Sequence, residues 1–379
     1  MNLSLDKKNA DSPTNTLMTS LSEFYKGKRV LVTGHTGFKG SWLSIWLNEM
    51  GAVVGGISQE PSSDKDNYSL SDISGHLDLD ARADIRNGHW LKEIITEWKP
   101  DIVFHLAAQP LVRLSYSFPV ETFETNVLGT INVMEAIRLT PSVRSAVMIT
   151  TDKCYENKEQ IWGYRENDPM GGHDPYSASK GAAELAISSW RRSFFNTETL
   201  PDGQHQQIAS ARAGNVIGGG DWAKDRIVPD CIRALEEGRP VEIRSPHAVR
   251  PWQHVLEPLS GYLLLAKLMW EHPNQYNQAW NFGPANESVA TVWHVASEIV
   301  EAYGKGSLTD VSDPNSLHEA SLLTLDITKA RQLLAWQPVF TLQEAVRLTV
   351  DWYKRYASEN VYNLCREHIH TYSQKAGIM

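Results

Sequence analysis

The segment VLVTGHTGFKG, residues 30–40, joins a short apolar run to three glycines spaced three apart. Apolar residues then recur at helical spacing through residues 41–47. The pattern predicts a strand, a glycine turn and a helix. Glycines let the backbone turn sharply and approach a diphosphate, and a helix amino end supplies amide donors and a positive dipole end. For the glycines taken alone, a plain strand-to-helix turn is the alternative.

Buried strands recur after this turn. Mainly apolar runs at 52–57, 102–106 and 145–149 are separated by stretches of helical character, such as 121–138. Runs that are apolar on both faces and alternate with helices are typical of a parallel sheet covered on both sides. We therefore predict an α/β fold with a doubly wound, Rossmann-like parallel sheet.

The pattern changes after about residue 206. Strands are still expected at 208–211 and 279–282, and helices predominate at 228–238, 258–271, 289–303 and 342–359. This half is predicted to form a smaller, mostly helical substrate lobe that returns to the sheet. The predicted divisions are a mobile tail at 1–22, a nucleotide-binding domain at 23–212, the substrate lobe at 213–360 and a C-terminal tail at 361–379.

Composition narrows the class of protein. Over 379 residues the formal net charge is −9, which argues against a nucleic-acid or membrane-surface partner. Three distant cysteines, Cys154, Cys231 and Cys365, form no CxxC pair and no zinc-type spacing, so we expect neither a disulfide framework nor a metal site. Residues 1–20 lack the apolar core of a secretory signal, and the longest apolar run, 262–270, is too short to span a bilayer. We expect a cytoplasmic protein.

A second motif is YSASK, residues 176–180. Tyr176 and Lys180 are four residues apart, so on a helix they share one face. A nearby ammonium favours the phenolate and lowers the tyrosine pKa from about 10 towards neutrality. Such a tyrosine can act as general base towards an alcohol. Two surface residues are the alternative for this motif alone, but the glycine turn upstream makes the combination specific.

A third motif is TTDKCY, residues 150–155, which begins where the strand predicted at 145–149 ends. In parallel sheets the carboxyl ends of the strands form the ligand crevice. We therefore expect these polar side chains to face a cofactor. A simple strand-to-loop cap is the alternative.

Together these segments resemble the extended short-chain dehydrogenase/reductase family, from about residue 27 to about residue 356. The resemblance rests on residues 33–40, 105–108, Asn126, Thr151 and Asp152, Tyr176 with Lys180, and 212–216. Within the family, residues 151–157, 219–222 and 225–230 resemble the branch that dehydrates CDP-linked glucose.

The resemblance implies NAD in the 23–212 domain and a nucleotide sugar in the 213–360 lobe. It implies a cofactor site made of Gly34, Thr36, Gly37, Phe38, Gly40, Asp84, Ile85, Ala107, Ala108, Gln109, Asn126, Tyr176 and Lys180. The sugar nucleotide would contact Thr151, Asn215, Arg226 and Arg250. The protein is expected to be a homo-oligomer, a dimer or a tetramer.

Two of the binding segments depart from the expected pattern. Arg250 precedes Pro251-Trp252 where relatives often have Asp-Trp, and a solvated surface cation is its alternative. The second strand ends in Ser58-Gln59, without the acidic residue that grips a ribose 2′-hydroxyl, so NAD and NADP are not distinguished there.

The reaction implied begins with Tyr176, ionised by Lys180, taking the proton of the sugar 4-hydroxyl as hydride passes to NAD. Thr151 would hold that hydroxyl. The ketone acidifies carbon 5, Asp152 protonates the carbon 6 hydroxyl, water leaves, and hydride returns to carbon 6. Lys153 stands where many nucleotide-sugar dehydratases have Glu. Either it acts as the carbon 5 base with a lowered pKa, or it stabilises the enolate while another group moves the proton.

Three other functions compete with this interpretation. A nucleotide-sugar 4-epimerase would share the glycine turn, Thr151 and the YxxxK motif, but it needs no acid to expel water. A dehydratase could also act on a different nucleotide sugar. A cofactor-binding regulator without catalysis would not require the pairing of Tyr176 with Lys180.

Overall fold

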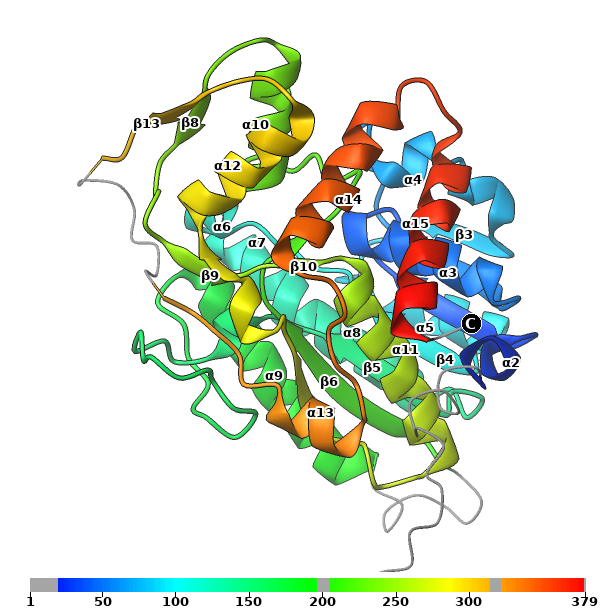
Figure 1. Ribbon diagram of the computed structural model, residues 1–379. Coiled ribbons are helices and arrows are strands. Elements are labelled where there is room, and N and C mark those ends of the chain that lie inside the picture. Colours follow the sequence, from blue (N-terminus) through cyan, green and yellow to red (C-terminus); the bar gives the residue numbers. More distant parts are fainter. Residues whose placement is uncertain (1–19, 196–204, 314–321, 378–379) are drawn as a thin grey trace, which may run out of the picture.

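The computed structural model describes residues 20–195, 205–313 and 322–377. At its centre lies a seven-stranded parallel sheet in the order β11-β6-β5-β4-β1-β2-β3 (Figure 1). The strands are β1 (Arg29–Thr33), β2 (Val53–Ser58), β3 (Leu79–Arg82), β4 (Ile102–His105), β5 (Ser145–Ile149), β6 (Gln207–Ala213) and β11 (Ala279–Phe282). The predicted Rossmann-like sheet is confirmed.

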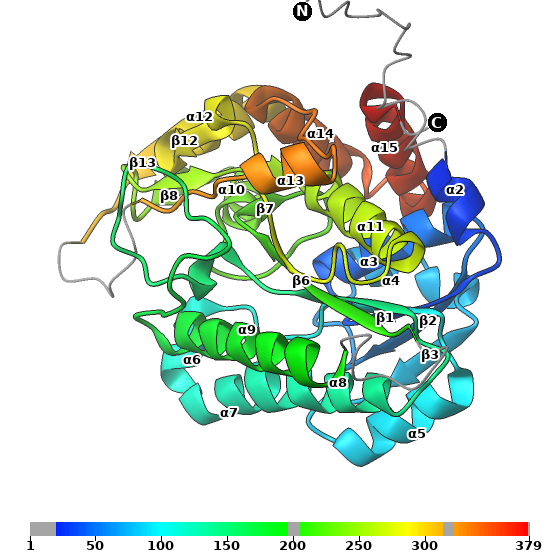
Figure 2. The same ribbon diagram turned by 90° about the horizontal axis from the view of Figure 1, so that it is seen from below.

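Helices cover both faces of this sheet (Figure 2). They are α3 (Phe38–Glu49) and α11 (Leu256–Glu271) on one face, and α5 (Gly88–Trp98), α8 (Thr130–Arg138) and α9 (Pro175–Phe194) on the other. In β1, Val30 and Val32 join the core that contains α3, while Leu31 joins the core under α5 and α8. Because neighbouring side chains of a strand point to opposite faces, a sheet covered twice needs this unbroken apolar run.

The second half forms the expected smaller lobe of helices above the sheet (Figure 1). Its helices are α10 (Ile227–Glu236), α12 (Val292–Tyr303) and α14 (Leu342–Arg355), while α13 (Thr328–Leu333) packs against β11 of the sheet. Three short strand pairs join it: β7 (Val216–Ile217) with β10 (Gln253–His254), β9 (Val249–Pro251) with β12 (Val289–Thr291), and β8 (Val241–Ile243) with β13 (Leu308–Asp310). Strand β11 and helix α11 return to the sheet.

Both predicted tails need correction where the structure describes them. Residues 1–19 lie outside the described part, but Ser20–Tyr25 form helix α2, and its Tyr25 hydroxyl donates to the carbonyl oxygen of Leu263 at 2.8 Å. Residues Val361–Ala376 form helix α15, whose His368 stacks on Trp42 of α3 at 6.0 Å. These segments are ordered because their aromatic side chains are buried against the main core.

The remaining elements are short. They are α4 (Asn67–Leu70), α6 (Val112–Ser117), α7 (Pro119–Phe123), the 3-10 turns η1 (Ile73–His76), η3 (Asp152–Cys154) and η4 (Asn286–Ser288), and the π-helical turn η2 (Glu124–Gly129). The helix predicted at 121–138 is therefore α7, η2 and α8 in succession. No helix in the described ranges is long and apolar enough to cross a membrane.

Candidate active site

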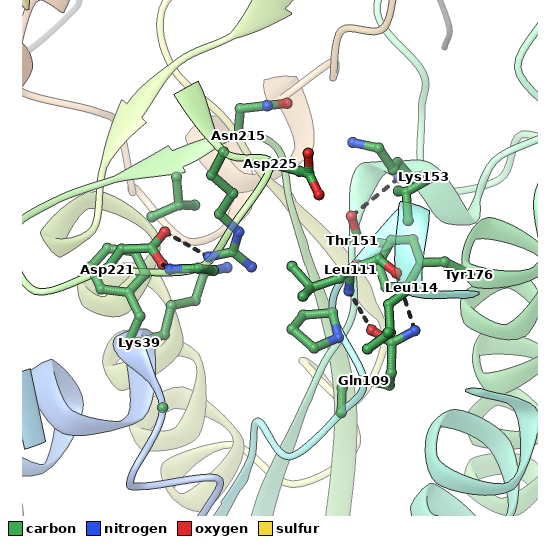
Figure 3. Close-up of a pocket in the computed structure, with 18 of the residues that line it drawn as sticks. Lys39, Gln109, Leu111, Leu114, Thr151, Lys153, Tyr176, Asn215, Asp221 and Asp225 are labelled. Atoms are coloured by element: carbon green, nitrogen blue, oxygen red, sulfur yellow. Dashed lines mark hydrogen bonds and ion pairs between the residues drawn. The ribbon is translucent and has the colours of Figure 1, made fainter. Parts of the chain in front are cut away.

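A cavity of about 1450 Å³ opens at the carboxyl ends of the central strands, below the C-terminal lobe (Figure 3). Its walls come from the glycine turn, from the loops after β4, β5 and β6, and from the start of α9. Of the residues predicted for the site, the cavity brings together Gly34, Thr36, Gly37, Phe38, Gly40, Asp84, Ile85, Ala107, Ala108, Gln109, Thr151, Asp152, Lys153, Tyr176, Lys180, Asn215, Arg226 and Arg250.

Asn126 is the predicted residue that does not line the cavity. It is fully buried in the π-helical turn η2, where its side chain accepts from the Gln109 amide at 2.8 Å and donates to the Gln109 carbonyl at 3.1 Å. A third bond reaches the Ser179 hydroxyl at 2.9 Å. Asn126 thus fixes the loop after β4 against helix α9, and Gln109 is the residue of this pair that faces the cavity.

The glycine turn forms a close backbone cradle. Gly34 has a φ of +77°, and a Cβ on Gly40 would lie 2.1 Å from the carbonyl oxygen of Gly34. Gly37, the N-cap of α3, provides no side-chain cap, so the first-turn amides of the helix are left for a ligand. A diphosphate fits this cradle, because uncapped amides at a helix amino end attract anions.

The end of β2 is polar but not acidic. The Ser58 hydroxyl hydrogen-bonds the Thr36 hydroxyl at 2.7 Å, and Thr36 also donates to the Gln59 carbonyl at 3.1 Å. Beside them the Asp84 carboxylate accepts from Gln59 and pairs with Arg86 at 2.6 Å, which lowers the Asp84 pKa.

The 3-10 turn η3 follows β5 and carries three predicted catalytic residues. The Thr151 hydroxyl donates to Asp152 Oδ1 at 2.9 Å and accepts from the Lys153 amide at 3.3 Å. Asp152 is 1% exposed, and its Oδ2 has no hydrogen-bond partner within the described part of the chain. A buried carboxylate oxygen without a partner is costly, which is typical of a group that meets a ligand.

Tyr176 differs from the expectation in its electrostatics. Burial raises the pKa of its phenol to about 12, the Thr151 hydroxyl lowers it through a hydrogen bond, and the charge of Asp152 raises it. Lys180, whose own pKa burial lowers to about 8, interacts mainly with Glu184 and Cys154. Burial therefore outweighs the groups that lower the Tyr176 pKa, which are the Thr151 hydroxyl and the charge of Arg226.

The opposite wall carries the arginines. Arg226 pairs with Asp221 at 2.7 Å. Arg250 is 7% exposed and donates to the Val249 carbonyl at 2.8 Å, so the alternative of a solvated surface cation is wrong. Near them the buried Asn215 Oδ1 has no partner among the described residues. Cationic and amide groups of this kind suit a diphosphate and a sugar.

Lys39 is a cavity residue that sequence reasoning did not select. It lies on the first turn of α3 on the Asp221 side, across from Thr151, Lys153 and Tyr176 (Figure 3). Burial and the charge of Arg226 lower the pKa of its ammonium to about 7. The sequence does contain a signal for Lys39, because it is the one Lys or Arg within residues 33–40, the glycine pattern.

Comparisons with known proteins agree with this geometry. The family model described as GDP-mannose 4,6 dehydratase matches residues 31–349. A CDP-glucose 4,6-dehydratase of Salmonella typhimurium is 48% identical over 332 residues, which are 87% of this chain and 92% of the relative.

Two solved structures show the same fold. UDP-glucose 4-epimerase of Thermus thermophilus, in complex with NAD, has a TM-score of 0.72 and 26% identity, covering 86% of this chain and 99% of the other. The dTDP-glucose 4,6-dehydratase DesIV of Streptomyces venezuelae, with NAD and TYD bound, has a TM-score of 0.72 and 21% identity, covering 88% and 99%. The chain belongs to the GDP-mannose 4,6-dehydratase family of extended short-chain dehydrogenases/reductases.

Proposed function

We propose that the protein is a CDP-glucose 4,6-dehydratase, which converts CDP-D-glucose to CDP-4-dehydro-6-deoxy-D-glucose with loss of water. The observation that carries the proposal is the meeting of Tyr176 with Thr151, Asp152 and Lys153 in one cavity beside a dinucleotide cradle. The 48% identity to a relative of that activity over 92% of its length supports the choice of substrate.

The cofactor proposed is NAD, held by the glycine cradle, by the loop after β4 and by Lys180. NAD supplies a reversible hydride acceptor when bound. The backbone of the glycine turn already packs too closely for a Cβ at Gly40, and the amino end of α3 has no side-chain cap. The diphosphate site is therefore formed before the cofactor binds. On the other side, the lobe at 213–360 would hold the nucleotide sugar through Asn215, Arg226 and Arg250.

The four catalytic side chains of the cavity then have different roles. Tyr176 takes the proton of the sugar 4-hydroxyl, while Thr151 is positioned beside both Tyr176 and Asp152. Asp152 gives a proton to the carbon 6 hydroxyl, which leaves as water. Lys153 takes a proton from carbon 5 and gives one back after the elimination.

Lys153 is the better candidate for the carbon 5 base than its neighbour Tyr155. The Tyr155 hydroxyl donates to Asn281 Oδ1 at 2.7 Å and accepts from Arg212 at 2.7 Å. Burial also raises the pKa of Tyr155, so its phenolate is inaccessible near neutrality. Lys153 instead is partly exposed and lines the cavity on the same turn as Asp152.

The experiment is incubation of the purified protein with NAD and CDP-glucose, followed by mass spectrometry of the sugar nucleotide. Loss of one water mass is expected. A 4-epimerase would leave the mass unchanged, and a dehydratase for another nucleotide sugar would prefer the dTDP, GDP or UDP sugar offered in parallel. Tyr176→Phe, which removes one oxygen, should keep the fold and NAD binding and lose turnover.

We further propose that the protein is a homo-oligomer, a dimer or a tetramer. Large apolar side chains are exposed on α7 and the turn after it, with Val120 at 70% and Leu128 at 54%. Clustered apolar side chains on a surface favour association. Light scattering should give two or four times the chain mass of 42.6 kDa, and a monomer at micromolar concentration would contradict the proposal.

A further inference from the structure

The proposed reaction creates a proton imbalance between two side chains. To begin a turnover, Tyr176 must be a phenolate and Asp152 must carry a proton. At the end Tyr176 holds the proton of the 4-hydroxyl, and Asp152 has lost its own to the departing water. Lys153 takes one proton from carbon 5 and later gives one back, after its ammonium has exchanged with solvent, so its own protonation is unchanged over the turnover. Every turnover therefore needs one proton to travel from Tyr176 to Asp152.

Thr151 lies between these two groups. Its hydroxyl hydrogen is directed at Asp152 Oδ1, at 2.9 Å, and its oxygen, which accepts from the Lys153 amide at 3.3 Å, keeps a second lone pair for a phenol. The same hydroxyl is the hydrogen-bonding neighbour of the Tyr176 side chain. Figure 3 shows Thr151 and Tyr176 on one wall of the cavity. In this arrangement a proton can pass from the phenol to the hydroxyl and on to the carboxylate, the direction in which it must move.

We propose that the Thr151 hydroxyl relays a proton from Tyr176 to Asp152. This single internal transfer ionises the base, Tyr176, and protonates the acid, Asp152. The inference rests on the proposed function. The Tyr176 O–H bond breaks as its proton joins the Thr151 oxygen, and the Thr151 proton moves to Asp152 Oδ1. The net charge of the three groups stays at −1, and no outside proton donor or acceptor is required.

Burial explains why an internal route is needed. Tyr176 is 8% exposed, and burial raises the pKa of its phenol to about 12, so loss of its proton to solvent is unfavourable near neutrality. The charges that act on the phenol are Asp152 and Asp174, which raise its pKa, and Arg226, which lowers it. A proton placed on Asp152 removes the nearest of the opposing charges, so the transfer itself favours the phenolate.

Two further cations lie at the acceptor end. Lys39, from α3, acts on Asp152, and Lys153 is the next residue on η3. Lys180, on the same helix as Tyr176, faces Glu184. These cations adjust how the proton is shared between phenol and carboxylate, and they provide no second hydroxyl bridge.

Asp152 can also pass the proton on. Its second oxygen, Oδ2, has no hydrogen-bond partner among the described residues and lies next to Gly214, where a Cβ would be 3.2 Å away. Rotation of the carboxyl group exchanges its two oxygens, and the missing side chain at Gly214 leaves room for this. The proton received at the Thr151 side can then be presented to the cavity.

The test is a single turnover with CDP-glucose in weak buffer, following reduced-cofactor absorbance and a pH indicator together. In the wild type we expect reduced cofactor to form with no proton released to solvent. Asp152→Asn and Thr151→Val should each release about one proton per reduced cofactor. Their rate of cofactor reduction should rise about tenfold per pH unit, because the phenol must then ionise into solvent.

Thr151→Ser is the matched control, since it keeps the hydroxyl and should retain proton-neutral reduction. The relay is overturned if Asp152→Asn reduces cofactor without proton release and with the pH profile of the wild type, or if Thr151→Val does so. Failure of the proposed function gives a different result, namely no loss of water from CDP-glucose in the wild type. Circular dichroism of each variant separates these outcomes from loss of fold.

Discussion

Glu184 and Arg212 form an ion pair at 2.8 Å in the interior, with side chains 3% and 4% exposed. Glu184 is one turn beyond Lys180 on α9 and also accepts hydrogen bonds from the Thr150 and Ser210 hydroxyls. Arg212, on β6, donates to the Tyr155 hydroxyl. The pair therefore joins α9 to β5 and β6 directly behind the catalytic turn.

Replacement of Arg212 by Met should destabilise the protein by about 3–5 kcal/mol, because it strands a buried carboxylate. Thermal and urea unfolding, followed by circular dichroism, measure the change. The matched control is Arg239→Met, which breaks the exposed pair with Glu237 and should cost about 0–1 kcal/mol. Equal losses in the two variants would contradict the assigned importance of the buried pair.

The same pair predicts a pH dependence of stability. Arg212 and the two hydroxyls hold the Glu184 pKa below its ordinary value of about 4.3, although burial opposes them. A lowered folded-state pKa contributes stability that is present above about pH 4.3 and is lost as the pH falls towards the folded pKa. Wild-type stability should therefore fall below pH 4.3 more steeply than that of Glu184→Gln.

Gly40→Ala should abolish tight NAD binding, because its Cβ would lie 2.1 Å from the Gly34 carbonyl oxygen and must displace the turn. We expect a loss of at least about 100-fold in NAD affinity, or about 2.7 kcal/mol, by isothermal titration calorimetry. Gly75→Ala is the control, since the nearest atom to its Cβ, a carboxylate oxygen of Asp72, is 4.0 Å away. Normal NAD binding by Gly40→Ala would place the cofactor elsewhere.

Lys39→Met should weaken binding of a diphosphate ligand in the cavity about tenfold, since it removes a cation and keeps the aliphatic stem. An anion favours the ammonium, whose pKa is about 7 in the free protein. Wild-type affinity should therefore decline as the pH rises above 7, and the variant should lack this decline. Titration with NAD and with CDP in separate experiments shows which diphosphate Lys39 serves, and Lys92→Met, exposed on α5, is the control.

Lys153→Met should slow the exchange of the carbon 5 hydrogen with solvent deuterium by about 100-fold or more, while reduced cofactor still forms. Mass spectrometry of the product reports the exchange. Lys92→Met, exposed on α5 and outside the cavity, should leave it unchanged. Exchange at the wild-type rate in Lys153→Met would contradict the assignment of Lys153 as the carbon 5 base.

The buried strands were the most predictable part of the fold. Strands β5 and β11 have the predicted bounds, because each is a short, mainly apolar run that ends at a polar residue or a glycine. Helix α12 begins at Val292, not at 289, since Val289–Thr291 pair with β9. That pairing brings together segments about 40 residues apart, and local periodicity carries no information about it.

Site prediction was good where a residue's backbone position determines its role. The glycine turn and η3 follow strands, so their place at the cavity could be inferred from the order of elements. Lys39 was not predicted, because the motif explains the glycines by their backbone conformation and says nothing of the side chain between Gly37 and Gly40. The pKa of Tyr176 was misjudged because the i,i+4 spacing indicates proximity to Lys180 but says nothing of burial.

Helix α15 covers the outer side of α3, with Tyr372 edge-on to Trp46 at 5.6 Å and Arg366 paired with Glu49 at 2.7 Å. During synthesis α3 leaves the ribosome about 300 residues before α15. The indoles of Trp42 and Trp46 on the nascent α3 therefore lack this cover until α15 has been made. An expression vector that stops before Val361 should yield insoluble protein, whereas a fusion placed after Ala376 should be tolerated.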